Sequence, residues 1–349
     1  SIELVELIEL GRKGMSGYEQ IAEYLKQKTR YRPEIGIICG SGLSGLSKTL
    51  HNTETFHYSE IPGFPQATVP GHAGELVFGL LGNIECVCMK GRFHYYEGND
   101  MLKVVLPIRV MRLLGVKLLI VTNAAGGLNS NFSVGDIVVI QDHFGLPCMA
   151  GLTPLRGVND DALGPRFPSM SDAYDKKLQE FVLNAAEKLS IRDRIRPNGT
   201  YCFLSGPTYE TPTECRFLKL LGGDTVGMST VPEIIAAKHC GMKILGLSLV
   251  TNIVVMDKNS DAVPASHAEV LEAVDASGRY VEAIVTEIAK KEILGDYLQS
   301  LPNFTYVPKL LVDAQAETKE KEAKEREAEK ARIVSETRVN DLFTFSIVA

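Results

Sequence analysis

Short apolar runs of β-type composition recur along the chain, and segments with helical spacing separate them. The runs are "EIGIIC", "ELVFGLL", "IECVCM", "VKLLIVT", "DIVVI", "GTYCF" and "KILGLSLV". Apolar positions in "VVLPIRVMRLL" and across residues 174–189 instead recur with the period of a helix. Strands that alternate with helices predict an α/β fold, in which a mixed or parallel sheet carries helices on both faces.

Turn and capping residues mark where several of these elements begin and end. The pair Gly82 and Asn83 between two β-type runs predicts a tight hairpin, so part of the sheet is expected to be antiparallel. Three helix starts are predicted by a Ser or Thr followed three residues later by Glu, the pattern of a reciprocal cap. They are Thr211 with Glu214 (and Pro212 in the first turn), Thr230 with Glu233, and Ser266 with Glu269. Each follows a strand-like run, so these helix starts are expected to face a site at one sheet edge.

The character of the chain changes near residue 310. Between residues 317 and 332, six side chains are acidic and six are basic, with opposite charges at helical spacing and no apolar heptad. This composition is typical of a solvated helix or of disorder. We therefore predict one folded domain over residues 1–310 and a charged C-terminal extension, helical or disordered, over residues 311–349.

Composition and charge narrow the class of protein. Hydrophobic residues make up 45% of the 349 residues and charged residues 23%, which is ordinary for a soluble globular protein. A net charge of −6 argues against nucleic acid or an anionic membrane as the main partner. The start "SIELVELIELGRK" carries three glutamates, unlike a signal peptide, and the uncharged run 244–256 fits a buried strand better than a membrane span.

Cysteine and histidine usage add two expectations. Seven scattered cysteines suggest reduced thiols and hence a cytoplasmic protein, and Cys86 and Cys88 are expected to pack in the core. The seven histidines form no close ligand pair, so we expect no metal site.

The loop "CGSGLSGL" raises the question of a nucleotide cofactor. Gly40, Gly42 and Gly45 spell the dinucleotide-binding pattern G-x-G-x-x-G. That pattern also needs a following helix and an acidic residue about twenty positions on, and Glu60 at that distance sits in a turn-rich stretch. Ser41 beside clustered backbone N–H groups suits a free phosphate better, although a tight turn without a ligand would give the same glycines.

Two further stretches favour an anionic substrate. In "KGRFHYYEG", Arg92, His94 and Tyr96 occupy alternate positions, which face one side of an extended segment. Arginine makes a two-pronged contact with phosphate, and histidine can add a hydrogen bond. In "VTNAAGGLN", a strand-like run ends in Asn123 and small residues, which let backbone approach a ligand closely.

The ordered motifs "GSGL", "VPGHAGELVFG", "GRFHYYEG", "TNAAGGLN", "RFPSMSDAYD", "SGPTYET", "VGMSTVPE" and "LVTN" resemble those of the trimeric purine nucleoside phosphorylases. The resemblance covers roughly residues 10 to 290. It implies a single-domain α/β sandwich with a mixed central β-sheet flanked by helices. It also implies reversible phosphorolysis of 6-oxopurine nucleosides, such as inosine and guanosine, in purine salvage. The expected assembly is a homotrimer without a cofactor, in which inorganic phosphate is a co-substrate.

By this resemblance, three groups of residues have implied roles. Those expected to hold phosphate are Ser41, His72, Arg92, His94, the backbone of Ala124, and Ser229. Those expected to hold the ribose are Tyr96, Met228, His267 and, from a neighbouring subunit, Phe167. Those expected to hold the base are Tyr209, Glu210, Val226 and Asn252. Among them, His94, Glu210, Asn252 and His267 are the implied catalytic residues.

The implied base readers suit a 6-oxopurine. The carboxylate of Glu210 matches the N1–H donor, and the amide of Asn252 can donate to O6 and accept from a protonated N7. His267 would bond the 5′-hydroxyl, and its place at a helix start favours the neutral imidazole. The implied mechanism cleaves the C1′–N9 bond through an oxocarbenium-like state by positioning and electrostatics.

Three alternatives remain open at this point. A methylthioadenosine phosphorylase would lack a polar 5′ reader such as His267 and would usually carry Asp in place of Asn252. An NAD-binding oxidoreductase would need the missing ribose-binding acid. A catalytically silent scaffold would act through the charged extension. This sequence departs from the animal members of the family at position 253, where it has Ile253 and they usually have lysine.

Overall fold

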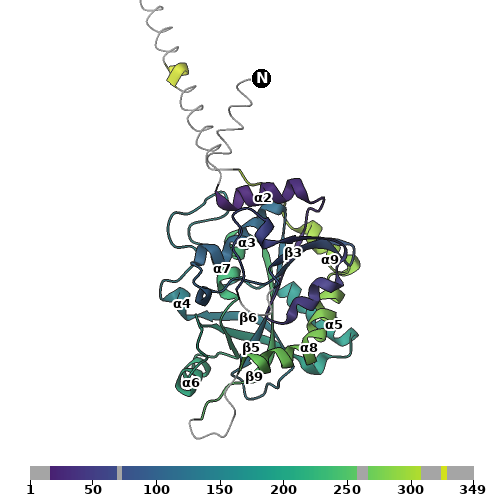
Figure 1. Ribbon diagram of the computed structural model, residues 1–349, viewed down its shortest axis with the longest axis vertical. Coiled ribbons are helices and arrows are strands. Elements are labelled where there is room, and N and C mark those ends of the chain that lie inside the picture. Colours follow the sequence, from purple (N-terminus) through teal and green to yellow (C-terminus); the bar gives the residue numbers. More distant parts are fainter. Residues whose placement is uncertain (1–15, 69–72, 258–265, 308–323, 328–349) are drawn as a thin grey trace, which may run out of the picture. The chain divides into compact units, whose positions relative to one another are not determined.

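The computed structural model describes residues 16–68, 73–257, 266–307 and 324–327. Residues Ser16–Thr305 form one compact unit, which contains the whole sheet (Figure 1). Apart from one helical turn at 324–327, the charged extension lies outside the described residues. The predicted domain boundary at residue 310 therefore stays a prediction.

The central feature is a nine-stranded mixed sheet with the order β2-β3-β4-β1-β5-β8-β7-β6-β9. Its strands are β1 Ile35–Cys39, β2 His51–His57, β3 Glu75–Leu81, β4 Ile84–Lys90, β5 Leu118–Gly127, β6 Ile137–Gly145, β7 Ile195–Phe203, β8 Thr225–Gly227 and β9 Lys243–Ile253. Strand β9 also pairs in parallel with β5, so the second half of the sheet closes on itself. This closure brings the ends of β5, β8 and β9 together.

Helices cover both faces of the sheet, as the alternating pattern predicts (Figure 1). The α-helices are α2 Gly17–Lys28, α3 Met101–Leu114, α4 Leu146–Met149, α5 Lys176–Lys188, α6 Pro212–Leu220, α7 Val231–His239, α8 His267–Ile288 and α9 Lys291–Ser300. Short 3₁₀ helices are η1 Leu43–Thr49, η2 Tyr58–Glu60, η3 Tyr95–Glu97 and η4 Arg192–Arg194. The implied α/β sandwich with a mixed sheet and flanking helices is thus confirmed.

Strand β1 shows how the sequence pattern builds the two layers. Ile35, Ile37 and Cys39 point into the apolar core that the sheet shares with α5, α8 and α9. Gly36 faces the other side, where an added Cβ would lie 3.0 Å from Met111 of α3. A strand covered on both faces is apolar throughout, which explains the continuous run "IGIIC".

All seven predicted strands are present, and two strands were not predicted. The hairpin between β3 and β4 is confirmed: Leu81 pairs with Ile84, and Gly82 and Asn83 have positive φ of 56° and 65°. The missed strand β2 carries mostly polar, solvent-facing residues and has no apolar run to reveal it. The missed β8 has only three residues and is defined by its neighbours β5 and β7.

Two of the three predicted caps are confirmed. Thr211 with Glu214 starts α6, with Pro212 in its first turn, and Ser266 with Glu269 starts α8. The third helix, α7, starts directly after Thr230 as predicted, but the predicted cap hydrogen bonds do not form there, because Thr230 and Glu233 both contact Arg92.

The glycine loop after β1 does not lead into the α-helix that a dinucleotide site requires. It leads instead into the 3₁₀ helix η1. Its glycines serve packing: a Cβ on Gly40 would lie 2.6 Å from the Asn123 backbone, and one on Gly45 would collide with Glu282 of α8. The dinucleotide alternative is therefore not supported by the local fold.

All seven cysteines are free thiols. Cys86 and Cys88 are buried in β4, as predicted. Among the described residues, no helix has the length and apolar character needed to cross a membrane.

Candidate active site

A cavity of about 510 Å³ lies where β5, β8 and β9 end. All the predicted site residues that the structure describes line it except Phe167. His72 lies outside the described residues. The structure thus gathers around one cavity side chains from the loop after β1, the segment after β4, three strand ends and the start of α8.

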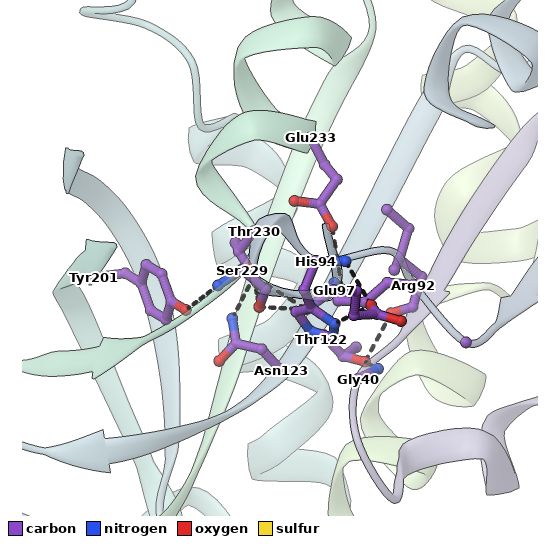
Figure 2. Close-up of polar contacts among 12 residues, drawn as sticks. Gly40, Arg92, His94, Glu97, Thr122, Asn123, Tyr201, Ser229, Thr230 and Glu233 are labelled. Carbon is purple, nitrogen blue, oxygen red and sulfur yellow. Dashed lines mark hydrogen bonds and ion pairs between the residues drawn. The ribbon is translucent and has the colours of Figure 1, made fainter. Parts of the chain in front are cut away.

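One end of this cavity is built around a buried arginine. Arg92 is 2% exposed, and its Nη1 donates to Oγ of Ser229 at 2.7 Å and to Oγ1 of Thr230 at 3.3 Å. Its Nε lies 3.1 Å from Oε1 of Glu233 in the first turn of α7, as Figure 2 shows. A guanidinium held in this way, next to a serine hydroxyl, is suited to an oxyanion.

The same contacts explain why the predicted cap of α7 does not form. Thr230 has φ 76° and ψ −56°, and the N–H of Val231 donates to the carbonyl of Ser229 at 2.8 Å, which defines a γ-turn of the strained type. Its hydroxyl accepts from Nδ2 of Asn123 at 2.9 Å and from Arg92, and it makes no cap hydrogen bond. Glu233, the expected cap partner, faces Arg92. The two residues that match the cap pattern, Thr230 and Glu233, therefore contact Arg92 and do not cap the helix.

His94 and Glu97 form a second pair at this end of the cavity. Oε1 of Glu97 lies 3.0 Å from Nδ1 of His94, and Oε2 accepts from the backbone and hydroxyl of Thr68. Burial lowers the pKa of His94 below its usual value of 6.5. Burial would raise the pKa of Glu97, but hydrogen bonds from His94 and Thr68 outweigh it and lower that pKa to about 2.

This pairing constrains what His94 can offer a ligand. An ionised carboxylate only accepts, so Nδ1 carries the proton in this pair, and in the neutral imidazole Nε2 is an acceptor. At Nε2, either a protonated phosphate donates a hydrogen bond to the neutral imidazole, or the imidazole is itself protonated and donates to the phosphate.

The cavity is also lined by a carboxylate, Glu210, and an amide, Asn252. Burial raises the pKa of Glu210 above its usual value of 4.5. Asn252 is the second-to-last residue of β9. The hydroxyl of Thr251 lies 3.3 Å from Oδ1 of Asn252, which helps to orient the amide. Tyr209 and Val226 complete this wall. A half-buried carboxylate next to a carboxamide can recognise a flat ligand that presents both donors and acceptors.

An aromatic side chain, a thioether and an imidazole also line the cavity. Tyr96 stacks on His94 with ring centroids 4.7 Å apart, and burial raises the pKa of Tyr96 to about 12, so its hydroxyl stays protonated. Met228 follows β8, and His267 is the first residue of α8, directly after the confirmed cap residue Ser266. These groups offer apolar contact and hydroxyl partners to a ligand in the cavity.

Two sequence-derived positions behave differently. Phe167 is 88% exposed and does not line the cavity of its own chain. Ile253, the departure from lysine, is 45% exposed and is absent from the cavity wall; it packs near Gly127.

Sequence reasoning missed five polar residues of the site region: Thr68, Glu97, Thr230, Glu233 and Thr251. Glu97 stands three residues after His94, a spacing that a 3₁₀ turn converts into a contact. Glu233 was assigned to capping. Among the described residues, no cluster of three or more histidine, cysteine, aspartate or glutamate side chains could hold a metal ion.

Comparison with known proteins identifies the class. Residues 34–290 match the phosphorylase superfamily. This chain is 52% identical over 279 residues to a purine nucleoside phosphorylase of Mus musculus, covering 80% of this chain and 96% of the mouse protein. The chain is therefore an enzyme of the phosphorylase superfamily.

Solved structures agree with this assignment. One is a Schistosoma mansoni purine nucleoside phosphorylase in complex with inosine, 44% identical with a TM-score of 0.76, matched over 79% of this chain and 96% of that one. Another is a purine nucleoside phosphorylase in complex with ribose 1-phosphate, 42% identical with a TM-score of 0.72, matched over 78% and 96%. Within the superfamily, the chain belongs to the purine nucleoside phosphorylases.

Proposed function

We propose that this chain catalyses the reversible phosphorolysis of 6-oxopurine nucleosides. A phosphate oxygen bonds to C1′ of the sugar, the C1′–N9 bond breaks, and the products are a free purine and ribose 1-phosphate. The observation that carries this proposal is that one cavity is lined both by Arg92 and Ser229, which suit an oxyanion, and by the carboxylate of Glu210 and the amide of Asn252. Solved relatives hold inosine and ribose 1-phosphate, a substrate and a product of this reaction.

The part of the cavity around Arg92 is assigned to phosphate. Arg92 and Ser229 are already joined by a hydrogen bond, and His94 and Ser41 line the same cavity. Phosphate held there sits below C1′ and needs no protein nucleophile. His72 and the backbone of Ala124 keep the implied role in phosphate binding that the family resemblance gives them.

The part of the cavity around Tyr96, Met228 and His267 is assigned to ribose. Tyr96, whose hydroxyl stays protonated, is placed to bond the 3′-hydroxyl, and Met228 packs on the sugar. His267 bonds the 5′-hydroxyl. A polar residue at this position favours a nucleoside over methylthioadenosine, whose 5′ substituent is an apolar thioether.

The part of the cavity around Glu210 and Asn252 is assigned to the purine, against Tyr209 and Val226. The carboxylate of Glu210 accepts from N1–H, while the amide of Asn252 donates to O6 and accepts from N7–H as the leaving base takes up a proton from solvent. Because charge develops on the base as the glycosidic bond breaks, these contacts strengthen in the transition state and accelerate the reaction.

Inosine should be converted to hypoxanthine and ribose 1-phosphate only when phosphate is present. The reason is that phosphate is the nucleophile, and the site has no residue assigned to activate water. Hypoxanthine release is followed by absorbance in phosphate buffer and in a phosphate-free buffer of equal ionic strength. Equal rates in the two buffers would identify a nucleosidase and overturn the proposal.

We further propose that the enzyme is a homotrimer in which Phe167 covers the ribose of a neighbouring subunit. Its exposure of 88% within its own chain supports a role across a subunit boundary. The proposed reaction needs no metal or organic cofactor, since phosphate is the only co-substrate. The seven free thiols fit a reducing compartment such as the cytoplasm.

The variant Phe167→Ala should raise the KM for inosine while leaving the KM for phosphate nearly unchanged. Removing a buried aromatic contact of this size costs about tenfold or more in affinity. Mixed assembly with Arg92→Ala subunits provides a sharp control, because a hybrid trimer contains sites with both an intact pocket and a neighbouring Phe167. Activity above the sum of the two variants is expected, and sedimentation of a fully active monomer would contradict the trimer.

A further inference from the structure

A buried ion pair stands behind the phosphate end of the cavity. Glu233 and Arg92 are 3% and 2% exposed, and Nε lies 3.1 Å from Oε1. Arg92 lines the cavity and Glu233 does not. Figure 2 shows Glu233 approaching the guanidinium from α7, whereas Ser229 and Thr230 approach it from the turn before that helix. Glu233 therefore does not touch a ligand in the cavity, and its contact with the cavity wall is the one with Arg92.

A carboxylate at this position requires an explanation. Its negative charge opposes the binding of an anion at Arg92, and burying an ion pair contributes little net stability once both charges have lost their water. An apolar residue at position 233 would cover Arg92 without repelling phosphate. Compared with an apolar residue, the carboxylate of Glu233 adds an opposite charge beside the Nε edge of the Arg92 guanidinium.

The opposite edge is fixed independently. Nη1 donates to the hydroxyls of Ser229 and Thr230, and Thr230 is held by the γ-turn and by the hydrogen bond from Asn123. With an ion-pair contact at Nε and hydrogen bonds from Nη1, the guanidinium is held on two sides before any ligand arrives. Preorganised donors need no rearrangement when charge moves during the reaction.

We propose that Glu233 is a positioning residue for phosphate, which holds the guanidinium of Arg92 in place for the anion. The inference rests on the proposed function, because it concerns the co-substrate of that reaction. It also explains why the start of α7 uses a strained turn and forgoes the cap: the hydroxyl and the carboxylate that would close the cap are both committed to Arg92.

The test is Glu233→Gln, which preserves volume and removes the charge. The KM for phosphate is expected to rise about tenfold, equivalent to about 1.4 kcal/mol, within the range for coupled neighbours. The KM for inosine at saturating phosphate should be nearly unchanged. In an Arg92→Ala background the same substitution should have no further effect on phosphate saturation, because the residue through which it acts is gone.

Asp136→Asn is the matched control. Asp136 is another buried carboxylate, 6% exposed, whose Oδ2 lies 2.9 Å from Nε of Arg196 away from the cavity. Its replacement should lower the melting temperature without raising the KM for phosphate. If Glu233→Gln does not accumulate as folded protein, Glu233→Asp keeps the charge but withdraws it from Nε, and it should raise the same KM by a smaller factor.

The outcomes separate the two proposals. A wild-type enzyme that does not need phosphate overturns the proposed function. A phosphate-dependent wild type in which Glu233→Gln has an unchanged phosphate KM overturns the positioning role alone, as does a further effect in the Arg92→Ala background. Parallel losses in every kinetic constant, matched by Asp136→Asn, would show a structural role and would also overturn it.

Discussion

Replacing Asn252 with Asp is expected to lower kcat/KM for inosine by about a hundredfold, the cost of about 3 kcal/mol for a lost transition-state hydrogen bond. An ionised aspartate cannot donate to O6, and its charge repels that oxygen. With adenosine, the same carboxylate can accept from the exocyclic amine and, when protonated, can support N7. Activity on adenosine relative to inosine should therefore rise.

The structure limits how far this shift can go. The hydroxyl of Thr251 lies 3.3 Å from Oδ1 of Asn252 and can donate equally well to a carboxylate oxygen, so the side chain should keep its place. Glu210 still faces N1, which is an acceptor in adenine, and so a complete switch is not expected.

The measurement is kcat/KM for both nucleosides in the wild type and the variant. Asn131→Asp, the same chemical change at an exposed position, should leave the ratio of the two values unchanged. An unchanged ratio in Asn252→Asp would mean that another residue reads the 6-position.

The parts of the fold that the sequence predicted share one property: their signal is local. Strands buried on both faces are continuous apolar runs, and the hairpin at Gly82 and Asn83 needs only positive φ at two residues. Strand β2 was not predicted because most of its side chains face solvent. Strand β8 was not predicted because three residues are too few to show a periodic pattern. The closure of β9 onto β5 joins residues more than a hundred positions apart, which no local pattern records.

The residues of the site also fall into those that a local pattern predicted and those whose partners depend on tertiary contacts. The alternation of Arg92, His94 and Tyr96 predicted that they would share a side, and all three line the cavity. Thr230 and Glu233 matched a cap pattern equally well, and only the approach of Arg92 from the distant end of β4 decided their partners. Local patterns predict residue chemistry, but tertiary contacts decide which competing hydrogen bond forms.

Two glutamates at the start of α6 should respond to substitution in opposite ways. Burial raises the pKa of Glu210 above 4.5, whereas hydrogen bonds from Thr211 lower the pKa of Glu214. When folding raises the pKa of a carboxyl, the folded state becomes less stable as the pH rises from the ordinary pKa of that group through its raised pKa. A carboxyl with a lowered pKa adds stability above its ordinary value, which is lost as pH falls through the lowered one.

At pH 7.5, Glu210→Gln should therefore be at least as stable as the wild type and yet have about a hundredfold lower kcat/KM for inosine, because a neutral amide replaces the charged acceptor for N1–H. Glu214→Ala should instead lower the melting temperature, through loss of the cap, and leave kcat/KM nearly unchanged. In the wild type, kcat/KM should fall on the acid side at a pH above 4.5, where Glu210 takes up its proton. Thermal unfolding and the pH profile of kcat/KM check these outcomes. A Glu210→Gln enzyme with wild-type activity and an unchanged acid limb would show that this carboxylate is not the purine reader, and a joint loss of activity and stability would show that its role is structural.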